Sequence, residues 1–156
     1  NLRKKMTCCT INVKIAISII GISAGIMAGL CFAVEYHNWS TTIMALTSSF
    51  FAGIATWMHL AYKKNWMLEW PTTRFKTIFY STAFLFVFSA AGMVGCLIAA
   101  GINHQTLTHE GLQGENLWMT AVWCFMTAKW TGQCAWFSRA YSSEMMRPLA
   151  HTPPIH

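Results

Sequence analysis

The sequence predicts an all-α membrane protein with four transmembrane helices and both termini in the cytosol. Three observations lead to this fold class: an apolar composition, four long apolar segments, and basic residues confined to one side. Hydrophobic residues make up 54% of the chain and charged residues 10%, whereas about 25% of a soluble domain is charged. An aromatic content of 14% argues against disorder. The absence of Asp excludes aspartyl-protease dyads and Walker-type magnesium sites.

The four apolar segments cover residues 13–34, 43–62, 78–100 and 117–137. A helix of about 20 residues crosses the hydrocarbon core, and each segment reaches that length. A basic run precedes the first segment, as in a signal peptide, but the segment is longer than the apolar part of such a peptide, which has about 7–15 residues. We therefore expect a retained span, and one transmembrane domain over residues 1–156.

The basic residues set the expected orientation. Ten of the eleven lie before the first span or at its start, between the second and third spans, or after the fourth. The loops 35–42 and 101–116 contain neither Lys nor Arg. By the positive-inside rule the basic side, which includes both termini, is cytosolic.

The six cysteines lie in or beside the apolar segments without CxxC spacing, which indicates buried thiols and not a disulfide framework or a zinc site. Cys8 and Cys9 flank the first span on its basic side. Palmitoylation is one interpretation of this pair, and unmodified interfacial cysteines are the preferred one.

Two further patterns concern packing and modification. Gly21, Gly25 and Gly29 recur every four residues and predict a smooth helix face for close packing. Asn38-Trp39-Ser40 is a glycosylation sequon on the exoplasmic side. It lies close to the membrane, so we expect it to be mostly unused.

Two polar residues within the apolar segments draw attention because polar groups are costly there. Lys129 lies near the middle of the fourth span. It either extends its flexible stem toward the cytosolic interface or meets an anionic ligand in the bundle. His59, one turn before Tyr62 in the second span, is either a hydrogen-bonded packing residue or a ligand for a transition metal or haem iron.

The third loop and the chain beyond span four hold the remaining candidates. His104 and His109 are either incidental loop residues or ligands for a metal or haem. Another interpretation is that Glu110 and Glu115, in the same loop, form a site for a hard cation. Phe137-Ser138-Arg139-Ala140-Tyr141 follows span four. It is typical of an interfacial helix end, or else presents an Arg fork for a carboxylate beside aromatic stacking surfaces.

Taken in order, these motifs resemble the haem-responsive-gene family of small four-span haem transporters. The resemblance covers nearly the whole chain from span two onward, and span one matches only in its hydrophobicity. The matching residues are His59 with Tyr62, the run His104-Gln105-Thr106-Leu107-Thr108, Val122-Trp123-Cys124-Phe125 followed by Lys129-Trp130, and Phe137-Ser138-Arg139-Ala140-Tyr141 in place of the family's Phe-Ala-Arg-Lys-Tyr tail motif.

The resemblance implies haem movement from the exoplasmic or lumenal side to the cytosol, without covalent chemistry. It assigns His59, His104 and the tail motif to haem handling, with the two histidines as iron ligands. Two departures stand out: Ala140 replaces the usual lysine, and the longer third loop adds His109.

The residue chemistry fits a haem carrier independently, because haem is a flat apolar disc with two carboxylates and an iron that takes imidazole. Aromatic walls would come from Trp123, Trp130, Phe125 and Phe137, and Lys129 and Arg139 would supply charge. Tyr62 and Tyr141 are further candidates for haem contact. The expected partners are haem, as transported substrate, and the lipid bilayer, without nucleic acid; a homo-oligomer is compatible with the sequence.

Two other classes compete with haem transport. A metal-ion or proton-coupled transporter would use His104, His109, Glu110 and Glu115 as a cation gate. A tetraspan scaffold usually has a large external domain, which the short loop 35–42 disfavours. We expect no enzyme, since no nucleophile–base pair is visible. The tail shows no dileucine pair, which slightly favours the plasma membrane over endolysosomal membranes.

Overall fold

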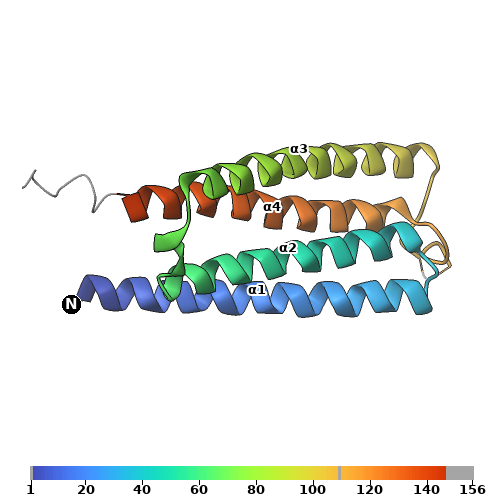
Figure 1. The fold of residues 1–156 in the computed structure, drawn as a ribbon. Coiled ribbons are helices and arrows are strands. Elements are labelled where there is room, and N and C mark those ends of the chain that lie inside the picture. The colour runs from blue at the N-terminus through green and yellow to red at the C-terminus, as the bar shows by residue number, and fades with distance from the viewer. Residues whose placement is uncertain (1, 109, 147–156) are drawn as a thin grey trace, which may run out of the picture.

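The computed structural model describes residues 2–108 and 110–146 and contains four long helices in antiparallel succession (Figure 1). The helices are α1 (Leu2–Val34), α2 (Trp39–Lys63), α3 (Thr72–Ile102) and α4 (Leu117–Met146), with a short 3-10 helix, η1 (Trp66–Glu69), between α2 and α3. The all-α prediction is confirmed.

The helices pack in the spatial order α1, α2, α4, α3 (Figure 1). The chief contacts join α1 to α2, α2 to α4, and α4 to α3. The start of α1, the end of α4 and η1 lie at one end of the bundle, and the loop between α3 and α4 lies at the other. Helix α4, last in sequence, therefore has α2 on one side and α3 on the other.

Three of the helices in the described part of the chain are long and apolar enough to cross a membrane: Thr10–Val34, Trp39–Lys63 and Thr72–Ile102. Helix α4 is as long, with 30 residues, but carries more polar side chains. Thr127, Thr131 and Ser138 on α4 are buried in the bundle, where each hydroxyl donates to a backbone carbonyl of its own helix. Four helices are thus confirmed, and three of them as candidate spans.

Large apolar side chains on the outside of the bundle are consistent with a lipid surrounding. Along α3, Tyr80, Phe84, Val87 and Phe88 are 63–70% exposed. Their spacing places them on one helical face. A soluble protein rarely exposes so large an apolar patch, whereas lipid tails cover it without cost.

The three glycines of α1 allow close packing, as their spacing predicts. A Cβ on Gly21 would collide with the ring of Trp130 on α4, one on Gly25 would lie 2.7 Å from the Ala45 carbonyl oxygen, and one on Gly29 would lie 2.9 Å from a Leu46 methyl. The α1–α2 seam also contains a hydrogen bond of 2.9 Å from the Ser49 hydroxyl to the Ile22 carbonyl. Small residues and interhelical hydrogen bonds are the usual devices for joining helices in lipid.

Candidate haem-handling site

His59 lies in the interior of the bundle, on the face of α2 that packs against α4. Its side chain is 2% exposed, and its Nδ1 lies 2.8 Å from the hydroxyl oxygen of Tyr141. The ring of Phe137, one turn earlier on α4, meets the imidazole edge-on with 4.7 Å between centroids. The structure therefore joins the second-span histidine to the first and last residues of the Phe137–Tyr141 segment.

Tyr62 completes this aromatic cluster. Its ring stacks on Tyr141 with 4.0 Å between centroids and 15° between the planes. The Phe137 ring also stacks on Tyr141, with 5.5 Å between centroids. Lys14 of α1 places its ammonium 4.5 Å from the centre of the Phe137 ring. A cation over an aromatic face is attracted by the ring quadrupole. The cluster thus draws on three helices.

The hydrogen bond to Tyr141 bears on what His59 can bind. It occupies Nδ1 and leaves Nε2 as the nitrogen available to an iron. A metal-binding histidine usually donates its other ring N–H to a fixed acceptor, which sets the tautomer and the ring orientation. Tyr141 is placed to be that acceptor when Nδ1 carries the proton.

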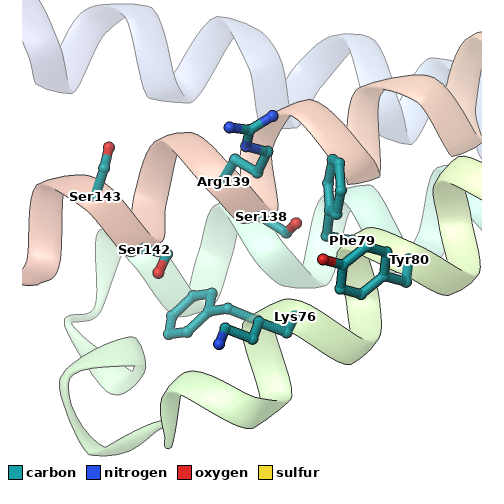
Figure 2. A pocket seen from close by; sticks show the side chains of 8 residues that line it. Lys76, Phe79, Tyr80, Ser138, Arg139, Ser142 and Ser143 are labelled. Carbon is teal, nitrogen blue, oxygen red and sulfur yellow. The ribbon is translucent and has the colours of Figure 1, made fainter.

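Arg139 lies on the opposite side of α4 from this cluster. Its guanidinium carbon lies 5.2 Å from the centre of the Phe79 ring of α3. Between α3 and α4 is a cavity of about 400 Å³ (Figure 2). Its lining residues are Phe75, Lys76, Phe79, Tyr80, Ser138, Arg139, Ser142 and Ser143. We call this the cationic cavity.

A second cavity, of about 530 Å³, shares Phe79 and Arg139 with the first. Lys129 lines it, with its ammonium 4.6 Å from the centre of the Trp130 ring. The remaining lining is mostly apolar: Ala83, Phe86, Ala128, Gly132, Gln133, Ala135, Trp136 and Phe137. We call this the apolar cavity. Phe137 borders it and also contacts His59, so one aromatic ring separates the histidine from the α3–α4 groove.

At the other end of the bundle, His104 follows the last residues of α3 with a left-handed backbone, φ 50°. The amide of Gln105 donates to the Ala100 carbonyl at 3.0 Å, which closes the helix as a Schellman motif does. The Gln105 side chain then accepts a bond from the amide of Leu117 at 2.7 Å, at the start of α4. Gln105 ties the two helices together, and the side chain of His104 is left exposed.

Glu115 and Asn38 are structural residues of the same end. The carboxylate of Glu115 accepts the amide of Trp39 at 2.9 Å and contacts the Ser40 hydroxyl, at the start of α2. An anionic side chain is stabilising there because a helix N-terminus carries partial positive charge. Asn38 is fully buried: its oxygen accepts the Thr41 amide, and its amide nitrogen donates to the Asn116 carbonyl. A buried, fully bonded Asn38 is consistent with an unused sequon.

Comparison with known proteins identifies the family. Residues 76–130 match a family model described as haem transporter, endosomal/lysosomal, haem-responsive gene. The chain is 43% identical to the heme transporter hrg-1 of Caenorhabditis elegans, over 97% of this chain and 82% of that protein. It is 33% identical to hrg-4 of the same organism, over 88% and 83% of the two chains. This chain belongs to the haem-responsive-gene family of haem transporters. No solved structure matches it.

The structure brings some of the expected haem-handling residues together and separates others. His59, Tyr62, Phe137 and Tyr141 form one cluster, whereas Lys129 and Arg139 face the groove toward α3. Trp130 is 1% exposed against α1 and is part of the packed core. Trp123 is half-buried on α4. His109 lies outside the described residues.

The geometry gives little support to the competing hypothesis of a cation gate. Within residues 2–108 and 110–146, no group of three or more His, Cys, Asp or Glu side chains could hold a metal ion. Glu115, one of the four residues of that hypothesis, is bonded to the start of α2.

The sequence did not indicate Lys76 and Phe79 as site residues, and it did not indicate the structural role of Gln105 within the His104–Thr108 run. Lys76 and Phe79 are three residues apart, so they share a helical face, and this spacing was a usable signal. The role of Gln105 depends on the start of α4, twelve residues further along the chain, and no local pattern indicates it.

Proposed function

We propose that this protein carries haem from the exoplasmic or lumenal side to the cytosol, using His59 as an iron ligand in the inner half of the bundle. The observation that carries the proposal is the 2.8 Å contact between His59 Nδ1 and the Tyr141 hydroxyl. It unites two motifs that are 82 residues apart and leaves Nε2 for iron. The relatives named heme transporters hrg-1 and hrg-4 support haem as the substrate.

In this proposal α4 crosses the membrane with the other three helices, and both termini are cytosolic. Its position between α2 and α3 supports a span, because neighbouring helices shield its polar side chains from lipid. The basic residues Lys63, Lys64, Arg74 and Arg139 belong to the end of the bundle where α1 begins and α4 ends. That end is cytosolic by the positive-inside rule.

The path has two stations. His104 captures haem iron at the exposed outer loop, with His109 as a further ligand in the same loop. Haem then reaches the α3–α4 groove, where Phe137 contributes aromatic wall and Lys129 and Arg139 attract the carboxylates. Trp123 lines neither cavity, so its part in the wall stays a prediction. Displacement of the Phe137 ring opens His59 to the iron, since that ring lies between the histidine and the apolar cavity. Binding at each station is modest, because a tightly held substrate does not leave.

The family description points to endosomal or lysosomal membranes. The lumen of these compartments corresponds to the outside of the cell, so the proposed direction is the same in either membrane. The slight preference for the plasma membrane, and a homo-oligomeric state, stay predictions.

Growth of a haem-auxotrophic host on low haem tests the function directly. Cells that express the protein should grow where control cells do not, and His59→Ala should lower growth at equal membrane abundance. Purified protein should also shift the Soret band of added haem, whereas a metal-ion carrier would not. Normal growth of cells carrying both His59→Ala and Arg139→Ala would show that the inner station lies elsewhere.

A further inference from the structure

The cationic cavity contains two basic side chains from different helices. Lys76 comes from the first turns of α3, and Arg139 from the second half of α4 (Figure 2). The eight lining residues include no acidic side chain to neutralise them. Hydroxyl groups of Tyr80, Ser138, Ser142 and Ser143 complete the polar lining, and those of Ser138 and Ser143 already donate to carbonyls of α4. Such a set of cations and hydroxyl donors suits carboxylate oxygens.

The neighbouring apolar cavity complements this charge. It is larger, at about 530 Å³, and aromatic rings from both helices border it, among them Phe79, Phe86 and Trp136. The two cavities meet at Phe79 and Arg139. An apolar compartment beside a cationic one matches a flat apolar disc whose carboxylates project from one edge.

The tail motif of this chain raises the question of a second cation. Haem has two carboxylates, but Ala140 stands where the family's tail motif has a lysine, so Arg139 is the only cation of the motif. Ala140 lines a further cavity, of about 410 Å³, together with Trp136, Arg139 and Ser143. A lysine at position 140 would therefore add its charge close to Arg139.

We propose that Lys76 binds the second haem propionate, opposite Arg139 across the α3–α4 groove, and so takes the place of the lysine that Ala140 replaces. This inference rests on the proposed haem transport and adds a residue of α3 to the site. With alanine at position 140, the second cation comes from α3 and not from α4. The two propionates would then be bound by side chains of two different helices.

Haem and its dimethyl ester provide the test, because the ester keeps the iron and the ring but lacks free carboxylates. Both are titrated by Soret absorbance into the purified full-length protein in lipid nanodiscs. We expect Lys76→Met to weaken haem binding about fivefold, the upper range for a solvent-exposed charge pair, and to leave the ester unchanged. The double variant Lys76→Met/Ala140→Lys should bind haem within about twofold of the unmodified protein, because the new lysine would form a charge pair of similar strength with the propionate.

Lys64→Met is the matched control. Its ammonium lies at the same end of the helix bundle as Lys76, 4.6 Å from the centre of the Trp66 ring. Lys64 does not line the cationic cavity. Lys64→Met should bind both compounds normally. The inference is overturned if Lys76→Met binds haem like the unmodified protein, if it loses haem and ester equally, or if Ala140→Lys restores nothing. Failure of the unmodified protein to bind either compound would instead refute the proposed function.

Discussion

His104 occupies a backbone conformation that favours glycine, with φ 50°. Non-glycine residues in this region carry a cost of order 1 kcal/mol or more, and such residues concentrate at functional sites. The helix end itself is closed by Gln105, whose amide bonds back to Ala100 and whose side chain accepts the Leu117 amide. The closure of this helix end therefore depends on Gln105, and the side chain of His104 is exposed, as the proposed capture of haem requires.

The variant His104→Gly separates these two roles. Glycine relieves the left-handed backbone, so the midpoint of thermal unfolding should stay within about 2 °C of the unmodified value. Haem uptake should fall several-fold, because the first iron ligand is lost. Gln105→Ala is the opposite control and should destabilise the protein by about 1 kcal/mol, because the half-buried side chain loses its hydrogen bonds to Leu117 and Glu115. Normal haem uptake by His104→Gly would exclude haem capture at this residue. Normal uptake by the double variant His104→Gly/His109→Ala would exclude haem capture by either loop histidine.

Tyr141 gives a second test at single-residue scale. Tyr141→Phe keeps the stack with Tyr62 but removes the hydroxyl that bonds His59. Loss of such a supporting hydrogen bond weakens metal binding by about tenfold or more, so haem affinity and haem-dependent growth should both fall. Tyr62→Phe removes a hydroxyl from the same stack without touching the His59 contact and should have the smaller effect. Equal effects of the two variants would argue against iron binding by His59.

At the scale of elements, α1 is joined to the bundle through its glycines. The face of Gly21, Gly25 and Gly29 lies so close to α2 and α4 that added methyl groups meet backbone and ring atoms. The face of α2 that receives α1 also carries the Ser49 hydroxyl bonded to α1. Packing of this kind has little tolerance for added volume.

Gly25→Ala should therefore destabilise the protein by about 1–3 kcal/mol. The new methyl group would lie 2.7 Å from the Ala45 carbonyl oxygen, which belongs to the α2 backbone and cannot turn aside. Gly53→Ala on α2 is the control, because a methyl group there has no neighbour within 4 Å. Thermal unfolding followed by circular dichroism in detergent compares the two. Alanine forms helix better than glycine, so Gly53→Ala should keep or slightly raise the stability. An equal loss of stability in both variants would contradict close packing as the cause.

The elements also show what sequence alone can and cannot predict. Long apolar runs predict the helices, since each must satisfy its backbone within the bilayer. Helical period also predicts that Arg139 faces away from Phe137 and Tyr141, because two residues correspond to about 200° of rotation. The order α1, α2, α4, α3 could not be predicted, because neither the apolar runs nor the greater polarity of α4 indicates which helices become neighbours.

At the scale of the whole molecule, charge is divided between the two ends. The end formed by η1 and the adjoining helix ends carries Lys63, Lys64 and Arg74, whereas the opposite loops contain Glu35 and Glu115 but neither Lys nor Arg. Helix α3 contacts the rest of the bundle chiefly through α4. The position of α3 therefore depends on its packing against α4, and the two cavities lie along that contact.

Topology is the last prediction, and it decides whether α4 spans the membrane. Three helices meet the length and composition of a span, and α4 is more polar. If all four cross, epitope tags at the two termini are both cytosolic, and a tag inserted after Leu107, which is 60% exposed, is on the other side. If α4 does not cross, the two terminal tags lie on opposite sides, because an odd number of spans separates them.

Antibody access before and after selective permeabilisation of the plasma membrane reads out the side on which each tag lies. Only tagged forms that support growth on low haem are compared, which ensures that the insertion has not disrupted the bundle. Terminal tags on opposite sides would leave Lys129, Arg139 and the α3–α4 groove without a continuous path to the cytosol, and would refute the four-span transport mechanism.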